Sequence, residues 1–396
     1  SCVITNENIN EMLDIAGFEE VNTVYSGSFP SQMVSGMNEG VSFYNYRGYY
    51  GVSGFGSSNV NSTSNGFMLP VATVITCGTG SFASSSESLI ESFIRAGTAS
   101  NPKGSVVCIG TATLGTHTMF NNIVDMGFYY GALIEGLETP GAALVYGKMM
   151  LYNNYPSNPS NWCHIFSHWN NLMGESSLQM WTSYPEMTTV DHPFSIPTGT
   201  NYIDINVSKE NGPVEEAWVT ILMDDEIFES GYTNTNGHVR LPIISVQNGE
   251  VLVTVTKKNH YPYQSSFQIY DPGVSIGFGE SPYTLNDDNS GESNGNNDMM
   301  ANGGETLEIY VSGKNYGSED ATNVIAHISS LSNNVIIDSA SSSVEFGDMI
   351  AGGTIVSEVP FVITLNEGLS EGANLDLFVE FTDEDGNSFN SILDID

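Results

Sequence analysis

Positive charge is scarce in this sequence of 396 residues, which has nine lysines and arginines against 46 aspartates and glutamates. Its formal net charge is −37. Binding to phosphate needs clustered cations, so we expect no nucleic-acid partner. Such acidity is typical of proteins that stay soluble in saline surroundings or that bind divalent cations.

Cysteine is also scarce, and the sequence contains no C-x-x-C pair. The four cysteines are widely spaced, at Cys2, Cys77, Cys108 and Cys163. They therefore predict neither a disulfide framework nor a zinc site. No apolar run is long enough to span a membrane, and the polar start, SCVITNENINEMLDIAG, is unlike a signal peptide. We expect no transmembrane segment.

Cys77 stands out because of what surrounds it. The apolar, β-favouring run Val71–Thr76 leads directly into this cysteine, and a glycine-rich turn and a helix-like segment follow. A thiol between a strand end and a helix N-terminus lies where the thiolate is electrostatically favoured. Cys77 is therefore a candidate nucleophile, and a buried structural cysteine is the alternative.

Strand-like and helix-like segments alternate after Cys77. We expect a buried strand at 105–109, helices at about 120–135 and 141–155, and a short strand at 178–182. This alternation predicts an α/β domain with a largely parallel sheet that is covered by helices on both faces. In such sheets the chemistry gathers at the carboxyl ends of the strands.

Four separated motifs carry a resemblance over about residues 1–190. In order they are NYRGYYG, ITCGTGSF, VVCIGTATLGTH and WNNLMGESSLQMWTSYP. This order resembles the catalytic domain of gingipain-type cysteine peptidases, which have a caspase-like α/β/α fold and a Cys–His dyad. The resemblance implies a secreted or cell-surface bacterial endopeptidase that acts on peptides or proteins, with Cys77 as its nucleophile and no catalytic cofactor.

The chain departs from the family at the general base. The family strand ends in Asn-Tyr-x-Gly-His-Gly, whereas here Gly48 is followed by Tyr49, Tyr50 and Gly51. A phenol, which titrates near pH 10 in model peptides, cannot replace imidazole as the base at neutral pH. The chain is then either a catalytically inactive homologue or a peptidase whose base has moved. The oxyanion would be bound near Gly48, Tyr50, Gly51 and Gly78.

His117 is the candidate for a relocated base. It follows the strand after that of Cys77, where the family places a wall of the substrate pocket, and Thr111 and Thr113 would line a polar rim there. A pocket-lining or structural histidine is the alternative. Arg47, just before the altered motif, could favour the thiolate or bind a carboxylate, or it could be a solvated or locally paired arginine.

The matched region begins shortly before the altered motif, so it corresponds to only the later part of a family catalytic domain. We expect the missing N-terminal part of a longer precursor to be a partner of this chain. The predicted domains are 1–198 for the partial peptidase domain, 199–280 for an immunoglobulin-like β-sandwich and 281–396 for an acidic, adhesion-type β-sandwich. Short alternating strands with Asn-Gly turns support the second domain, which resembles the immunoglobulin-like domain that follows the catalytic domain in gingipains. Strand-like runs support the third domain, which resembles the adhesion-type β-sandwiches of secreted bacterial proteins.

The entry to the third domain is an acidic loop. Residues 281–396 hold 21 of the 46 acidic residues and a single cation, Lys314. Calcium prefers six to eight flexible oxygen ligands, which this glycine-rich loop can supply. We expect a structural calcium site, and a solvated linker is the alternative. The candidate ligands are Asp287, Asp288, Asn289, Asn294, Asn296, Asp298 and Glu305.

Three hypotheses follow for the whole chain. It is a gingipain-like endopeptidase, a catalytically inactive relative that binds or scaffolds at the cell surface, or a purely structural or adhesive surface protein. Cys77 and its glycine loop favour the first two, while Tyr49 favours the second over the first.

Overall fold

A computed structural model describes residues 2–224, 226–243, 245–370 and 372–395. The chain divides into two compact units, Ser1–Pro185 and Glu186–Asp396. Among the described residues, no helix combines the length and the apolar character that crossing a bilayer requires.

A four-stranded sheet forms the centre of the N-terminal unit, in the order β1-β2-β5-β6. The strands β1 (Phe43–Tyr46), β2 (Val71–Val74) and β5 (Val107–Thr111) run parallel, and β6 (Asn170–Gly174) pairs antiparallel with β5. The parallel sheet expected from the sequence is thus confirmed, with one antiparallel edge.

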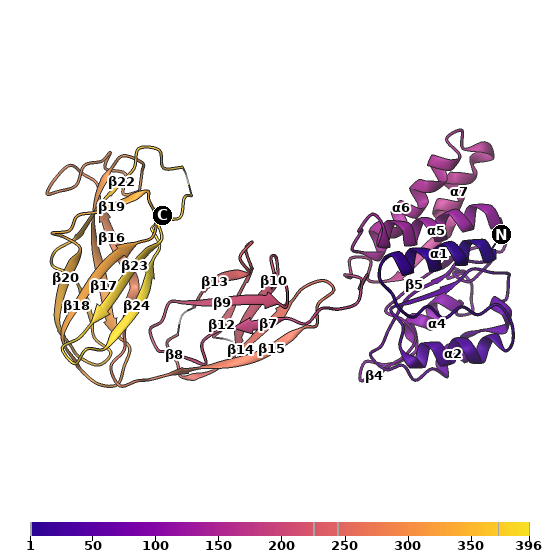
Figure 1. Cartoon of the computed structure of the whole chain (residues 1–396), viewed down its shortest axis with the longest axis horizontal. Helices are drawn as coiled ribbons and strands as arrows, with labels where there is room; N and C mark the ends of the chain where they lie inside the picture. The colour runs from indigo at the N-terminus through magenta and orange to yellow at the C-terminus, as the bar shows by residue number, and fades with distance from the viewer. Residues whose placement is uncertain (1, 225, 244, 371, 396) are drawn as a thin grey trace. The chain divides into compact units, whose positions relative to one another are not determined.

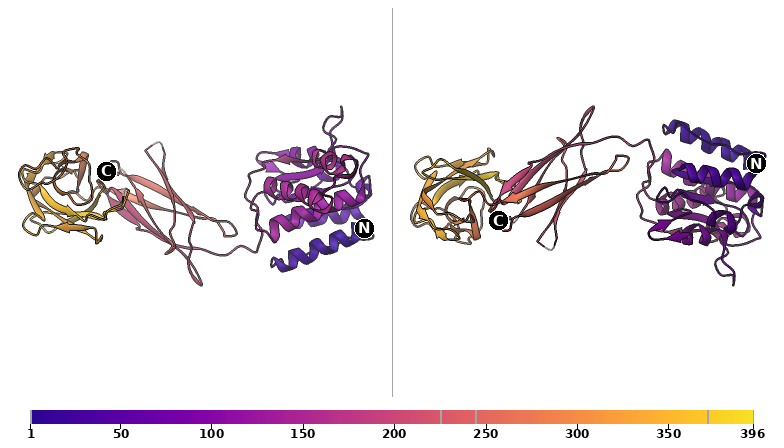
Figure 2. Two further views of the ribbon diagram at one scale, coloured as in Figure 1. Left: turned by 90° about the horizontal axis from the view of Figure 1, so that it is seen from above. Right: turned by 90° about the horizontal axis from the view of Figure 1, so that it is seen from below.

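Helices cover both faces of this sheet (Figure 2). One face carries α1 (Cys2–Ile15), α5 (Thr118–Leu133), α6 (Pro140–Asn154) and α7 (Trp162–Trp169). The other carries α2 (Phe29–Glu39), α3 (Ser57–Asn61) and α4 (Leu89–Arg95). Shorter elements complete the unit: η1 (Val52–Gly54), η2 (Pro159–Asn161), β3 (Gly97–Thr98) and β4 (Asn101–Pro102).

The strand sequences divide their side chains between two cores. Successive residues of a strand point to opposite faces, so Val107 and Ile109 enter the core under α5 while Cys108 enters the core under α4. Every residue of β2 and β5 is buried. This explains why both strands are nearly continuous apolar runs in the sequence.

The expected strand at 178–182 is absent, and this prediction was wrong. The fourth strand is β6, directly after α7, and its pairing with β5 joins Gly174 to Val107 and Asn170 to Thr111. The sequence NNLMG is a poor strand former, so the tertiary pairing with β5 decides its conformation. The helices expected at 120–135 and 141–155 are confirmed as α5 and α6.

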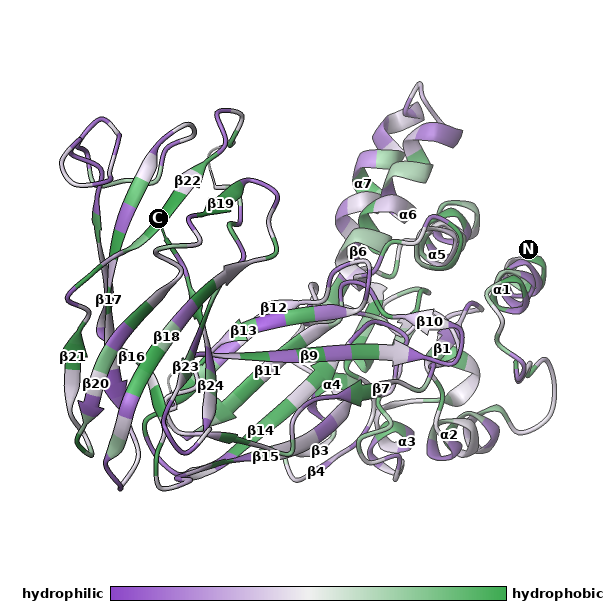
Figure 3. Cartoon of the chain, turned by 60° about the vertical axis from the view of Figure 1, so that its left-hand side comes forward, coloured by the Kyte–Doolittle hydropathy of each residue, from purple (hydrophilic) through white to green (hydrophobic). Residues whose placement is uncertain are grey.

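The second unit begins with a β-sandwich. One sheet contains β10-β9-β13, with β7 paired to β9, and the other has the order β12-β11-β14-β15-β8 (Figure 1). The strands are β7 (Thr189–Asp191), β8 (Ser195–Pro197), β9 (Tyr202–Lys209), β10 (Gly212–Pro213), β11 (Trp218–Met223), β12 (Ile227–Tyr232), β13 (His238–Pro242), β14 (Gly249–Thr256) and β15 (Tyr263–Tyr270). Apolar and polar residues alternate along β9 (Figure 3), so one face of the strand enters the core.

The expected domain boundary at 198/199 lies earlier in the structure. Both β7 and β8 pair with strands of the sandwich, so the chain changes unit between Pro185 and Glu186. These two strands have three residues each, which is too short for an alternating pattern to be recognised in the sequence.

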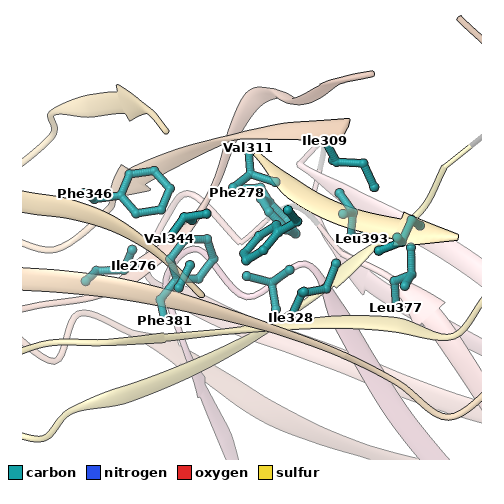
Figure 4. Close-up of a cluster of buried hydrophobic side chains, with 14 of the residues drawn as sticks. Ile276, Phe278, Ile309, Val311, Ile328, Val344, Phe346, Leu377, Phe381 and Leu393 are labelled. Atoms are coloured by element: carbon teal, nitrogen blue, oxygen red, sulfur yellow. The ribbon is translucent and has the colours of Figure 1, made fainter. Parts of the chain in front are cut away.

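A second β-sandwich completes this unit. Its sheets have the orders β16-β17-β22-β19, with β21 paired to β17, and β20-β18-β23-β24. The strands are β16 (Ile276–Asn286), β17 (Thr306–Asn315), β18 (Ala321–Ser330), β19 (Val335–Ile337), β20 (Ser343–Met349), β21 (Thr354–Val356), β22 (Phe361–Leu365), β23 (Leu377–Thr382) and β24 (Ser388–Leu393). Side chains from both sheets interdigitate in its core (Figure 4). Because β16 runs through the expected boundary at 280/281, this sandwich also begins earlier than predicted.

Candidate functional site

The candidate site lies where the three parallel strands of the N-terminal unit end. The segments after β1, β2 and β5 contain Tyr49, Cys77 and His117 respectively. Parallel strands deliver their carboxyl ends to one edge of a sheet, which is why residues so far apart in the sequence reach the same edge.

Cys77 lies in a tight turn three residues after the end of β2. The hydroxyl of Thr79 donates hydrogen bonds to the carbonyls of Val74 (2.6 Å) and Thr76 (3.1 Å), which closes the chain around the cysteine. Gly78 follows with φ +73°, a left-handed conformation that favours glycine. The thiol is partly exposed rather than enclosed in a core, so a reactant can reach it.

The partner of this thiol is Thr116. The Cys77 Sγ lies 2.9 Å from the Thr116 hydroxyl oxygen, and either group can donate the hydrogen bond. Thr116 was not predicted as a site residue. Its position directly before His117 was the available signal, because a loop that brings His117 to the thiol brings its neighbour too.

The helix expected to begin near Cys77 starts later than its sequence suggested. Ser84–Glu87 lies outside α4, which begins at Leu89 after the cap residue Ser88. The N–H of Ile90 in the first turn donates to the carbonyl of Thr79 at 3.0 Å. The helix that begins beside Thr116, the hydrogen-bond partner of the Cys77 thiol, is α5, whose N-cap residue is His117.

His117 is exposed and caps α5. Its Nδ1 accepts a hydrogen bond from the N–H of Met119 at 3.2 Å, and its ring meets Phe120 edge to face at 5.7 Å between centroids. The cap occupies Nδ1 and leaves Nε2 for another partner. Within the described residues, no hydrogen bond joins His117 to Cys77.

The segment that replaces the family's histidine motif is open to solvent. Tyr49 is 84% exposed and Tyr50 is 69% exposed. Gly51 has φ +79° and precedes the short helix η1. Among the residues that the structure describes, the N–H groups of Tyr50 and Gly51 have no hydrogen-bond partner, so they remain available to an anion.

Three of the predicted pocket residues form hydrogen bonds to other parts of the domain. The N–H of Gly78 donates to the carbonyl of Thr113 at 2.7 Å, so in this conformation it does not face an oxyanion. Thr111 is fully buried, and its hydroxyl donates to Asn170 Oδ1 at 3.1 Å. The Thr113 hydroxyl accepts from the N–H of Gly115 at 3.3 Å. Thr111 therefore holds β5 to β6 and does not form a pocket rim.

Arg47 is buried and not solvated, and among the described residues it forms no ion pair with a carboxylate. It is only 4% exposed, and its hydrogen bonds go to main-chain carbonyls and one amide oxygen. Gly48 shares this role as an acceptor, because its carbonyl receives hydrogen bonds from both Arg47 and the Thr76 hydroxyl.

The acidic loop of the second unit is ordered by its own backbone. The Asp287 carboxylate, which is fully buried, accepts hydrogen bonds from the N–H groups of Asp298 (3.1 Å) and Met299 (3.2 Å). The Glu305 carboxylate accepts from those of Asn296 (3.1 Å) and Asn302 (3.2 Å). Both carboxylates are thus buried and hydrogen-bonded within the loop.

The other predicted ligands form turns within the loop. A hydrogen bond from the Ser290 hydroxyl lowers the pKa of Asp288, and the Met300 N–H lowers that of Asp298. Asn289 donates to the carbonyl of Gly295, and the backbone of Asn294 bridges to β17. The structure does not gather three or more His, Cys, Asp or Glu side chains around one point anywhere in its described residues. Calcium binding therefore stays a prediction.

Comparisons with known proteins identify the family of the N-terminal unit. Residues 6–181 match the model of peptidase family C25. The N-terminal unit is a family C25 peptidase domain. No curated protein matches the chain.

Solved structures share the fold of about two thirds of this chain. The Arg-specific cysteine proteinase gingipain R is 18% identical, with a TM-score of 0.57 over 68% of this chain and 62% of its own. The complex of the pro- and mature domains of Porphyromonas gingivalis RgpB is 18% identical, with a TM-score of 0.56 over 67% and 63%. A further protease is 17% identical, with a TM-score of 0.50 over 66% and 63%. The present chain thus spans less than two thirds of the length of these proteins.

Proposed function

We propose that the C25 domain is a cysteine endopeptidase in which Cys77 is the nucleophile and His117 is the base. The observation that carries this proposal is the 2.9 Å contact between the Cys77 Sγ and the hydroxyl of Thr116, the residue next to His117. It brings a partly exposed thiol and the loop of an imidazole to the same end of the parallel sheet. A thiol next to a base is the arrangement that nucleophilic catalysis by cysteine requires.

The reaction would run through a thioester. The His117 Nε2 accepts the thiol proton, and the Cys77 sulfur forms a bond to the carbonyl carbon of the scissile peptide. The carbon–nitrogen bond then breaks, and the imidazolium returns the proton to the leaving amine. Water hydrolyses the thioester and regenerates the thiol. Contacts between catalytic groups are often loose without substrate, so we expect the Cys77–His117 hydrogen bond to form when substrate binds.

Oxyanion binding would fall to the segment after β1. The N–H groups of Tyr50 and Gly51 have no partner among the described residues, whereas that of Gly78 is bonded to Thr113. Preorganised N–H groups stabilise the negative charge that develops on the carbonyl oxygen. The substrate would be a peptide or protein that lies across this end of the sheet.

A test follows from the position of His117 at the N-cap of α5. Asparagine is among the best N-cap residues, so His117→Asn removes the imidazole while it keeps the cap. We expect a peptide-linked, thiol-directed electrophile to label Cys77 in the native chain and to fail with Cys77→Ala. Loss of a general base should slow labelling of His117→Asn by about 100-fold or more. Equal rates for His117→Asn and the native chain would remove His117 from the mechanism.

A second candidate function is a catalytically inactive, peptide-binding surface protein. It is favoured by the exposed Tyr49 at the position of the family's base and by the engagement of the His117 Nδ1 with α5. In that case the peptide electrophile leaves the native chain unlabelled, although a small alkylating reagent still modifies Cys77. Tyr49→His, which returns the histidine of the family motif, should then confer labelling.

We also propose that the chain acts outside the bacterial cell or on its surface. Its net charge of −37 and the two β-sandwiches that follow the C25 domain support this location. Fractionation of a culture that produces the protein tests it, with the medium and the intact cell surface examined separately. Recovery in the cytosol alone would contradict the proposal.

A further inference from the structure

Arg47 is a buried cation whose guanidinium binds three separate segments of the C25 domain. Its Nη1 donates to the carbonyls of Gly48 and Ile75, both at 3.1 Å. Its Nη2 donates to the carbonyl of Thr118 at 2.8 Å, and its Nε donates to Asn122 Oδ1 at 2.7 Å. All three guanidinium nitrogens thus take part in hydrogen bonds.

Each carbonyl that Arg47 binds lies close in sequence to one member of the candidate site. The acceptors come from the segment after β1, the turn after β2 and the start of α5. Each lies within two residues of a candidate side chain: Tyr49, Cys77 or His117. A single planar group with donors in fixed directions therefore joins the three parts of the site.

This arrangement keeps a charge buried without a close counter-ion. Among the described residues no carboxylate forms an ion pair with Arg47, and the nearby charge of Asp125 acts on it only through space. Burying a charge costs free energy unless it is well hydrogen-bonded. An apolar side chain would fill the same space at less cost but would leave the three segments unconnected.

We propose that Arg47 is a positioning residue that holds the Tyr49, Cys77 and His117 segments in one arrangement, so that the thiol stays beside Thr116. The effect of Arg47 on peptide labelling rests on the proposed peptidase function. Its effect on the surroundings of the Cys77 thiol does not depend on that function. A side chain that merely adds stability would lower the melting temperature without changing the surroundings of Cys77.

Alkylation of the native full-length chain by iodoacetamide measures those surroundings directly. Cys77 and Cys2 are both partly exposed, while Cys108 and Cys163 are buried, so the ratio of the Cys77 rate to the Cys2 rate has an internal reference. Mass spectrometry gives both rates from one sample. In Arg47→Ala the turn loses its tie to the other segments, so we expect this ratio to rise severalfold.

Chemical rescue tests whether the planar donors of the Arg47 guanidinium are needed or whether its positive charge is enough. Ethylguanidinium can enter the space left in Arg47→Ala and bind the same carbonyls, and it should return the ratio toward that of the native chain. Ethylammonium carries the charge but lacks the planar donors, so it should not. Arg95→Ala is the matched control, because Arg95 is exposed and its ion-pair partner is Glu87 at 3.5 Å. Its ratio should stay unchanged.

Arg47→Lys decides the matter if Arg47→Ala does not fold. Lysine keeps the positive charge but cannot reach all three segments, so the ratio should rise in the same direction. An unchanged ratio in a folded variant with a lowered melting temperature would overturn the proposal. Where the native chain is labelled by a peptide electrophile, Arg47→Lys should lose about 100-fold in that rate because a misplaced group is costly to catalysis. If the peptide electrophile does not label the native chain, the proposed peptidase function is contradicted. The ratio of the Cys77 to the Cys2 alkylation rate would still test the role of Arg47.

Discussion

The hydroxyl of Thr116 lies 2.9 Å from the sulfur of Cys77, across 39 positions of the sequence. This contact ties the turn after β2 to the loop before α5. It also places the residue next to His117 against the candidate nucleophile. The mechanism proposed above therefore depends on a side chain that is neither the nucleophile nor the base.

Removing that hydroxyl should weaken the site without unfolding the domain. Thr116→Val keeps the shape of the side chain and deletes its only polar atom. We expect peptide labelling of Cys77 to slow by about fivefold, because one hydrogen bond is worth roughly 1 kcal/mol and a factor of ten in rate is about 1.4 kcal/mol. Labelling kinetics measure the effect, and Thr98→Val, in the exposed hairpin of β3 and β4, is the control. Equal rates for Thr116→Val and Thr98→Val would remove Thr116 from the site.

Asp125 should make the stability of the chain depend on pH. This residue of α5 is fully buried, and within the described residues neither carboxylate oxygen has a hydrogen-bond partner. Burial raises its pKa from 3.8 to about 7, while the charge of Arg47 opposes the rise. The folded state therefore binds the proton more tightly than the unfolded state does. The stabilisation that this proton binding at Asp125 contributes is full below about pH 4 and is lost as the pH rises toward 7.

The variant Asp125→Asn should remove this dependence. Between pH 4 and 8 we expect the free energy of unfolding to fall for the native chain and to fall less for Asp125→Asn. The difference between the two falls should be on the order of 4 kcal/mol. Denaturant unfolding at several pH values measures the difference. Asp14→Asn, at an exposed position of α1, controls for the change in net charge. Parallel curves for Asp125→Asn and the native chain would show that Asp125 titrates alike in both states.

The contact between α5 and α6 depends on two facing glycines. A Cβ on Gly127 would lie 2.7 Å from the Gly147 Cα, and one on Gly147 would lie 2.5 Å from the carbonyl oxygen of Val124. Gly147→Ala must separate the helices, and we expect it to lower the free energy of unfolding by about 1–3 kcal/mol. Gly36→Ala in α2 meets open space and should instead raise it by about 1 kcal/mol through helix propensity. Chemical denaturation gives both values, and a loss of the same size at both positions would contradict the packing argument.

Calcium is expected to bind the loop at 287–305. A Cβ on Gly295 would lie 2.7 Å from the Asp287 Cβ and 3.1 Å from the Glu305 carboxylate carbon, so two buried acidic side chains share one part of the loop. A cation would relieve their repulsion and raise stability by about 2.7 kcal/mol at a free concentration about 100 times the dissociation constant. Calorimetric titration and melting with calcium or a chelator measure this. Asp287→Asn should abolish the response, and Asp385→Asn, in an exposed turn, should keep it. No heat and no shift in melting would leave only the solvated-linker alternative.

Some elements could be predicted from the sequence and others could not. The strands β9 and β17 are recognisable because the alternation of apolar and polar residues and the flanking turns are local signals. In contrast, β6 forms because β5 needs a partner, and its own residues favour a strand only weakly. Arg47 shows a further limit: its acceptors are backbone carbonyls from three segments, and no residue type marks where a carbonyl will point. His117 was identified as a site candidate, but its capping of α5 depends on where that helix begins.

The four cysteines of the chain are all free, which has a consequence for oxidation. Cys108 lies in the core under α4, Cys163 lies in the core under α7, and Cys2 is on α1, so none of them forms a disulfide with Cys77. A sulfenic acid formed at Cys77 would lack a neighbouring thiol to capture it as a reversible disulfide. Continued exposure to peroxide would carry it to the sulfinic acid, which thiol reductants do not reverse. The chain is therefore expected to need protection from oxidants throughout its isolation.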